Sequence, residues 1–214
     1  VRIGGIGSLL EKTFIIILYF LLQMEYTEFT FEAGQEVLRS QLEAVMMSRE
    51  EYATAHASLP IVCHDVAIFY HGSVLLVKRD NLPAKGEWFV IGGRVERGVM
   101  MEESLRRKVK VECGLEVVDV EFLGVARTLF ATDPFGHGRG TDTINFFYVA
   151  RGRGVLKLDD FHSSPRLLKE EEFTTDVKKE LHPYVVEILE KAFERMKKKG
   201  CELKKLYDLK KIKS

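Results

Sequence analysis

Residues 86–115, GEWFVIGGRVERGVMMEESLRRKVKVECGL, combine residue types and spacings that could carry chemistry. A short apolar stretch, residues 88–91, ends at a glycine pair, and a loop then leads to a segment rich in carboxylates. Gly114 stands where a helix C-terminal cap is expected. A strand, a glycine turn and a helix in this order form a rigid frame that can present backbone groups and carboxylates to a phosphate-bound metal. A plain connection between a strand and a helix is the alternative interpretation.

The same stretch resembles the Nudix box, in which a glycine, a loop glutamate and a helix with an arginine and several glutamates follow at fixed spacing. The pattern is matched at six positions, which are Gly93, Arg107, Val109, Glu112, Gly114 and Leu115. It fails at three positions: Val99 replaces the loop glutamate, and Lys108 and Val111 replace two helix glutamates.

The loss of helix glutamates is typical of one Nudix branch, the GDP-mannose mannosyl hydrolases, although Val99 departs even from that branch. The flanking residues 78–95, KRDNLPAKGEWFVIGGRV, are similar to that branch as well. The resemblance implies an α/β fold, the Nudix-type α/β/α sandwich with a mixed β-sheet, over residues 48–175. It also implies a metal-dependent hydrolase of a nucleoside diphosphate sugar, and a homodimer, since enzymes of this branch are commonly dimeric.

The resemblance assigns roles to five residues near the box. Glu112 and the Gly92 carbonyl would hold Mg2+ or Mn2+, which prefer oxygen ligands and bind substrate phosphates directly. Arg79 and Arg94 match arginines that contact the substrate diphosphate and the leaving group, where a guanidinium can bind phosphate oxygens bidentately. Asp65 matches an aspartate near the sugar.

A sixth residue, His162, lies in a segment (residues 158–166) that resembles the loop carrying the general base of the branch. Histidine suits that role because its ordinary pKa lies near neutrality. A metal-binding glutamine precedes the histidine in the branch, whereas Phe161 stands here and cannot coordinate a metal. Asp160 is a candidate replacement, and His137 and Asp142 are candidates to cover the sugar.

Each of these residues also has a structural interpretation. Glu112 could lie on a solvated helix face, and the two arginines could be surface residues. Asp65 could lie on the exposed face of a strand, and His162 could be an idle loop residue. Glu103 lies one turn before Arg107, so an ordinary ion pair is expected between them.

Periodicity and turn residues predict the elements that position these side chains. Ser48 and Glu51 form a capping-box pattern for a helix that ends near residue 56. Strands are expected at residues 62–70 and 73–78, joined as a hairpin, and at 144–150. Residues 117–130 are expected to form one or two strands, with Gly124 a candidate for a bulge. Further helices are expected at residues 32–45 and 183–199, and loops at 132–141 and 156–165.

Composition excludes several classes of protein. The 214 residues contain 46% apolar and 30% charged residues, which are ordinary globular values. The net charge is zero, which argues against a protein built to bind nucleic acid. The three cysteines show no C-x-x-C spacing, so reduced thiols in a cytoplasmic protein are expected.

The ends of the chain differ in composition from its centre. Residues 1–23 contain an apolar run too short to span a membrane, and a mis-assigned start codon is the preferred explanation, with a membrane anchor as the alternative. Residues 24–47 are expected to be a helical N-terminal segment, residues 48–175 the Nudix domain, and residues 176–214 a helix with a lysine-rich tail.

Three functions follow from this sequence. The first is hydrolysis of a nucleoside diphosphate sugar such as GDP-mannose, with water attacking the sugar carbon. The second is attack at phosphorus on ADP-ribose or a nucleoside triphosphate. The third is a non-catalytic nucleotide-binding module, which the losses at Val99, Val111 and Phe161 would suit.

Overall fold

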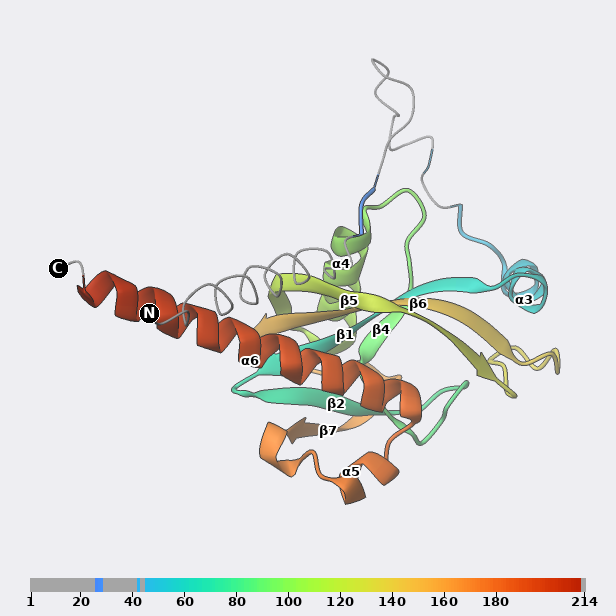
Figure 1. The fold of residues 1–214 in the computed structure, drawn as a ribbon. Coiled ribbons are helices and arrows are strands. Elements are labelled where there is room, and N and C mark those ends of the chain that lie inside the picture. The colour runs from blue at the N-terminus through green and yellow to red at the C-terminus, as the bar shows by residue number, and fades with distance from the viewer. Residues whose placement is uncertain (1–25, 29–41, 43–44, 213–214) are drawn as a thin grey trace, which may run out of the picture.

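The computed structural model describes residues 26–28, 42 and 45–212, with side chains as far as residue 199, as a mixed sheet between helices (Figure 1). The helices are α3 (Arg49–Ser58), α4 (Met101–Cys113), α5 (Thr175–Lys179) and α6 (Pro183–Ile212), with a 3-10 turn at Glu170–Glu172. The strands are β1 (Ile61–Tyr70), β2 (Ser73–Arg79), β3 (Trp88–Phe89), β4 (Ile91–Arg94), β5 (Glu116–Phe130), β6 (Thr141–Arg153) and β7 (His162–Leu168).

The sheet brings together segments that are far apart in the sequence. Its strands follow the order β3-β2-β1-β6-β5, with β4 paired to β1 and β7 paired to β2. The β1–β6 pair is parallel and the other pairs are antiparallel. The N-terminal half of β1 therefore lies between β4 and β6, and this is where residues of the Nudix box meet residues of the β5–β6 ribbon.

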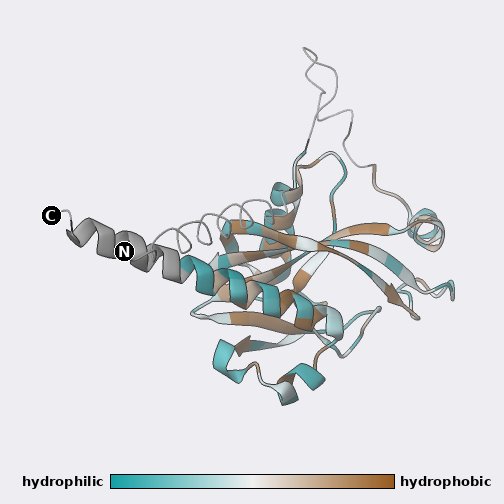
Figure 2. Ribbon diagram, viewed as in Figure 1, coloured by the Kyte–Doolittle hydropathy of each residue, from teal (hydrophilic) through white to brown (hydrophobic). Residues whose placement is uncertain are grey.

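Side-chain alternation divides the interior into two cores, one on each face of the sheet. Val66 and Ile68 of β1 pack with the apolar face of α4, whereas Ala67 between them packs with α6. Hydrophobic residues run along the central strands, while hydrophilic and hydrophobic residues lie side by side on α6 (Figure 2). The predicted α/β sandwich with a mixed sheet is confirmed, and α6 is one of its outer layers.

Local signals explain where the helices begin and end. The Ser48 hydroxyl accepts a hydrogen bond from the Glu51 N–H at 3.2 Å, and the Glu51 carboxylate accepts one from the Ser48 N–H at 2.7 Å, as the capping box predicts. Helix α4 ends at Gly114, whose φ of 71° is the left-handed conformation that glycine adopts at little cost. The Glu103–Arg107 ion pair also forms, with a separation of 2.5 Å.

Several predicted elements are confirmed and two are wrong. The 62–78 hairpin is present, and the β5–β6 register shifts between Phe122 and Gly124, where a bulge was expected. The loop expected at 156–165 is wrong at its end, because β7 begins at His162 and pairs with β2 despite its polar sequence. The single strand expected at 88–91 is divided, since Val90 separates β3 from β4.

The ends of the chain are described only in part. The apolar run at residues 1–23 lies outside the described residues, as does the helix expected at 32–45 except for its positions 42 and 45. Among the described residues, no helix is both long and apolar enough to cross a membrane.

Candidate functional site

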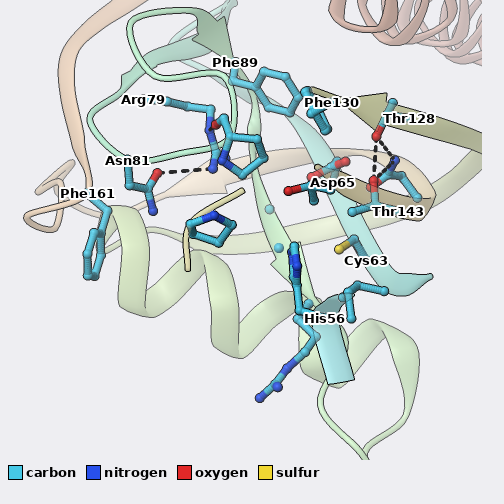
Figure 3. Close-up of a pocket in the computed structure, with 18 of the residues that line it drawn as sticks. His56, Cys63, Asp65, Arg79, Asn81, Phe89, Thr128, Phe130, Thr143 and Phe161 are labelled. Atoms are coloured by element: carbon cyan, nitrogen blue, oxygen red, sulfur yellow. Dashed lines mark hydrogen bonds between the residues drawn. The ribbon is translucent and has the colours of Figure 1, made fainter. Parts of the chain in front are cut away.

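A pocket of about 330 Å3 opens where β1, β2, β4, α4 and β7 meet the β5–β6 ribbon (Figure 3). All six residues singled out from the sequence contribute to its lining: Asp65, Arg79, Gly92, Arg94, Glu112 and His162. The topology therefore brings into one cavity residues that are up to 97 positions apart in the chain (65 to 162).

Asp65 and Gly92 lie opposite each other in the β1–β4 pair, at the floor of the pocket. The approach is so close that a Cβ on residue 92 would overlap Asp65 Oδ1, which explains the glycine. Asp65 is only 5% exposed, and its Oδ2 accepts a hydrogen bond of 2.5 Å from the Tyr184 hydroxyl of α6. Burial raises the pKa of Asp65 to about 7, although the Tyr184 hydrogen bond opposes the rise. The alternative interpretation, in which Asp65 lies on the exposed face of a strand, is thus excluded.

The two arginines differ in how they are held. Arg79 Nε donates to the Pro83 carbonyl at 2.8 Å, and its Nη2 donates to Asn81 Oδ1 at 3.1 Å (Figure 3). Burial lowers the pKa of the Arg79 guanidinium from its ordinary value, and the nearby Asp65 and Glu112 oppose the shift. Arg94 is exposed and lies 4.6 Å from the centre of the Tyr52 ring, a cation–π geometry. Arg79 is therefore fixed in place, and Arg94 borders the pocket entrance.

His162 lies at the first position of β7, directly opposite Arg79 in the β2–β7 pair. Its ring is buried, and its Nδ1 lies 2.7 Å from Asp159 Oδ1. With the proton on Nδ1 donated to this carboxylate, Nε2 is left as an acceptor. Sequence reasoning gave Asp159 no role, although its position three residues before the histidine was a usable signal.

The other candidates from the sequence, Asp160, His137 and Asp142, are not part of the pocket lining. Asp160 is exposed, whereas its neighbour Phe161, which is 57% exposed, does line the pocket. His137 lies 2.8 Å from His56, measured between ring nitrogens. Asp142 accepts two hydrogen bonds from Arg127.

Glu112 points into the pocket from the last turn of α4 and is 9% exposed. Its Oε1 lies 3.5 Å from Lys108 Nζ, and its Oε2 is buried without a hydrogen-bond partner. Burial raises the pKa of Glu112, and the neighbouring Lys108 and His162 oppose the rise. A buried carboxylate oxygen without a partner is a position that a metal ion or an ordered water could fill.

Glu112 and Gly92 could supply two oxygen ligands to one divalent cation. Glu112 is the one retained box glutamate, and the Gly92 backbone lines the same pocket. Within the described part of the chain, no group of three or more histidine, cysteine or acidic side chains has the geometry to hold a metal. Mg2+ commonly uses one or two carboxylates and completes its shell with water and substrate phosphates.

The far wall of the pocket has a different character, which sequence reasoning missed. Its aromatic members come from α3, β5 and the loop after β5: Tyr52, His56, Phe130 and Phe135. Beside them, Thr128 and Thr143 hydroxyls lie 2.5 Å apart, and the Asn145 amide donates to both of them (Figure 3). Flat apolar surfaces next to a small polar network are suited to holding a nucleoside.

Comparison with known proteins identifies the class. The NUDIX domain family matches residues 64–190, which is more than half of the chain. The chain therefore belongs to the Nudix family and is a Nudix hydrolase.

Among its relatives, the low-salt glycan biosynthesis protein Agl8 of Haloferax volcanii is 30% identical over 145 residues, 66% of this chain and 87% of Agl8. An ADP-ribose pyrophosphatase of Methanocaldococcus jannaschii is 40% identical over 78 residues, 36% of this chain and 46% of that protein.

Solved structures confirm the fold. A MutT Nudix hydrolase from Burkholderia pseudomallei superimposes with a TM-score of 0.52 at 23% identity, covering 63% of this chain and 98% of that one. The Nudix domain of Shewanella oneidensis NrtR, solved with ADP ribose, gives a TM-score of 0.51 at 21% identity, covering 70% and 99%.

Proposed function

We propose that the chain hydrolyses a nucleoside diphosphate sugar of the GDP-mannose type by water attack at the anomeric carbon. The observation that carries this proposal is the Asp159–His162 pair, in which a buried imidazole is oriented by a carboxylate at 2.7 Å and faces the same pocket as Arg79 and Glu112. This arrangement is that of a general base held in one tautomer.

In the proposed reaction, His162 Nε2 removes a proton from water while the water oxygen bonds to the anomeric carbon. The bond between that carbon and the β-phosphate oxygen breaks, its electron pair leaves with the nucleoside diphosphate, and the sugar is released with inversion. Arg79 and Arg94 neutralise the charge that develops on the departing phosphate, and a preorganised cation is most effective at that point. Arg79 is held for this role by Pro83 and Asn81.

The proposed cofactor is Mg2+ or Mn2+, held by Glu112 Oε2 and the Gly92 carbonyl. When bound, such an ion withdraws charge from the diphosphate. The burial of Glu112 and the missing partner of its Oε2 support this assignment.

The far wall of the pocket is the proposed nucleoside site. Its aromatic side chains can stack on a base, and the polar network of Thr128, Thr143 and Asn145 can recognise base or ribose groups.

The relative from Methanocaldococcus jannaschii, named an ADP-ribose pyrophosphatase, supports attack at phosphorus as the second candidate reaction.

The test is turnover of a panel of nucleotide sugars, ADP-ribose and nucleoside triphosphates, each with and without magnesium. Free sugar and a nucleoside diphosphate, lost in both His162→Ala and Glu112→Gln, are the expected result. A nucleoside monophosphate product that survives His162→Ala would move the reaction to phosphorus. Binding without turnover would make the chain a nucleotide-binding module. His71→Asn changes an exposed turn histidine and is the matched control.

Two further proposals concern where and how the enzyme works. A cytoplasmic location is supported by Cys63 and Cys113, which are buried free thiols. A homodimer is proposed from the resemblance to the GDP-mannose branch, and sedimentation analysis of the full chain tests it.

A further inference from the structure

Lys108 stands where the Nudix box places a glutamate, and its side chain is directed into the pocket. The side chain crosses over Gly93, where a Cβ would lie 3.2 Å from Lys108 Cε and 3.4 Å from Nζ. Since Gly93 also has a φ of 153°, a side chain there would be strained as well as crowded. The glycine thus gives the lysine a path to the metal-ligand side of the pocket.

The ammonium ends beside Glu112, at 3.5 Å from Oε1. An ammonium group has three donors, and this long contact with one carboxylate oxygen does not use all of them. The Lys108 side chain is 30% exposed and is part of the pocket lining, so its remaining donors can reach a ligand there. Glu112 Oε2, in contrast, is buried without a partner. Lys108 Nζ can therefore still donate to an anion, and Glu112 Oε2 can still accept from a donor or bind a cation, at two separate positions.

Lys108 also changes the balance of charge in the pocket. Together with Arg79 and Arg94 it gives the lining three permanent cations. A nucleoside diphosphate ester carries about two negative charges on its diphosphate, and a charge-assisted hydrogen bond to a phosphate oxygen is among the stronger polar contacts in proteins. A glutamate at position 108 would instead repel the diphosphate unless a metal ion lay between them.

We propose that Lys108 is a built-in cation for the substrate diphosphate, which takes the place of a metal ion that a box glutamate would recruit. This proposal rests on the nucleoside diphosphate sugar proposed above as the substrate, and it adds a residue that binds the diphosphate. It has two consequences of opposite sign. The protein binds a diphosphate in the complete absence of metal, and the same ammonium weakens metal binding at Glu112 by repulsion.

The first experiment measures calorimetric binding of pyrophosphate, GDP and ADP to the full chain in EDTA. Lys108→Met keeps the length of the side chain and removes its charge, and is expected to weaken diphosphate binding on the order of 10- to 100-fold, the size of one charge-assisted contact. Lys108→Arg should retain most of the affinity. Lys110→Met is the matched control, because Lys110 is an exposed lysine on the same helix whose Nζ contacts Gly114 and Glu116 outside the pocket.

The second experiment measures Mn2+ binding to the nucleotide-free protein by electron paramagnetic resonance. Lys108→Met should bind Mn2+ more tightly than the unmodified chain, and Lys108→Glu more tightly still. A misfolded variant would lose both affinities, whereas the proposal requires one to fall and the other to rise.

Three results would overturn the role of Lys108. They are no diphosphate binding by the unmodified chain in EDTA, an equal loss in Lys108→Met and Lys110→Met, and an unchanged Mn2+ affinity in Lys108→Met. None of these results would contradict the proposed reaction, because that reaction is tested separately by the products formed with magnesium. If Lys108-dependent binding is found without turnover, the reaction fails and the cation site stands.

Discussion

The two walls of the pocket differ in the kinds of side chain that form them and in the part of a ligand that each can bind. The charged wall, formed by Asp65, Arg79, Arg94, Lys108, Glu112 and His162, places ionisable groups on adjacent strands and the end of one helix. The nucleoside wall, formed by Tyr52, His56, Phe130, Phe135, Thr128, Thr143 and Asn145, comes from α3 and the β5–β6 ribbon and contains no permanent charge.

This difference indicates how the pocket divides its work. Charge neutralisation and proton removal depend on short, fixed distances such as 2.7 Å between Asp159 and His162. Recognition of a base depends on flat surfaces and tolerates small shifts. Substitution of the proposed base on the charged wall should therefore change the rate, substitution of its cation Lys108 should change diphosphate affinity, and substitutions on the nucleoside wall should change affinity for the base.

The largest effect is expected for His162→Ala, which removes the proposed base. The rate constant kcat for sugar release should fall by about 100- to 10,000-fold, the range of general base catalysis, while KM changes little. Asp159→Asn should cause a smaller fall, because the imidazole remains but loses its orienting carboxylate. Steady-state kinetics with magnesium measure kcat and KM of both variants. A rise in KM without a fall in kcat would place His162 in binding and contradict the division.

The second effect concerns Asp65, whose burial on the charged wall has a cost in stability. Its folded pKa of about 7 lies above the ordinary value of about 4, so the unfolded chain loses this proton first as pH rises. Relative to Asp65→Asn, the protein should lose about 1.4 kcal/mol of unfolding free energy per pH unit between pH 4 and 7, and none above it.

Urea unfolding of both proteins across this pH range measures that difference. Asp119→Asn, which removes an exposed carboxylate on β5, is the control. A stability difference that is independent of pH would show that the pKa of Asp65 in the folded protein is the same as in the unfolded chain, and would contradict the raised pKa.

The third effect lies on the nucleoside wall. Phe135→Ala should weaken nucleotide binding by about tenfold, because a base stacked on an aromatic ring gains roughly 1–3 kcal/mol. Pyrophosphate affinity should not change, since that ligand has no base. Calorimetry with GDP and with pyrophosphate separates the two walls directly. An equal loss for both ligands would mean that the walls are not independent.

The smallest effect is expected for Ser48→Ala, which removes the capping-box hydroxyl of α3. Stability should fall by about 1 kcal/mol in urea unfolding. Because α3 carries Tyr52 and His56, nucleotide affinity should fall slightly while kcat is retained. Ser48→Asp keeps a capping group and should restore both. A large fall in kcat would show that α3 also supports the charged wall.

The sequence predicts the two walls unequally. Arg79, Gly92 and Glu112 lie at recognisable spacing, the hairpin shows clear alternation, and Gly114 marks the end of α4, so the charged wall could be anticipated. Phe135 and Asn145 have no such signal, because their place in the pocket depends on the parallel β1–β6 pairing, which only the tertiary fold specifies. β7 was missed for a related reason: its polar residues form a strand only because β2 offers a partner.

The hydrogen bonds that end α4 have a mechanical consequence. The last carbonyls of the helix, at Glu112 and Cys113, accept hydrogen bonds from the N–H groups of Asp159 and Lys157 at 2.9 and 3.0 Å. These bonds satisfy carbonyls that a helix end otherwise leaves open, and they tie the His162 segment to the helix that carries Glu112. Because the two segments are bonded directly to each other, Glu112 and His162 are expected to keep a constant separation when either segment shifts.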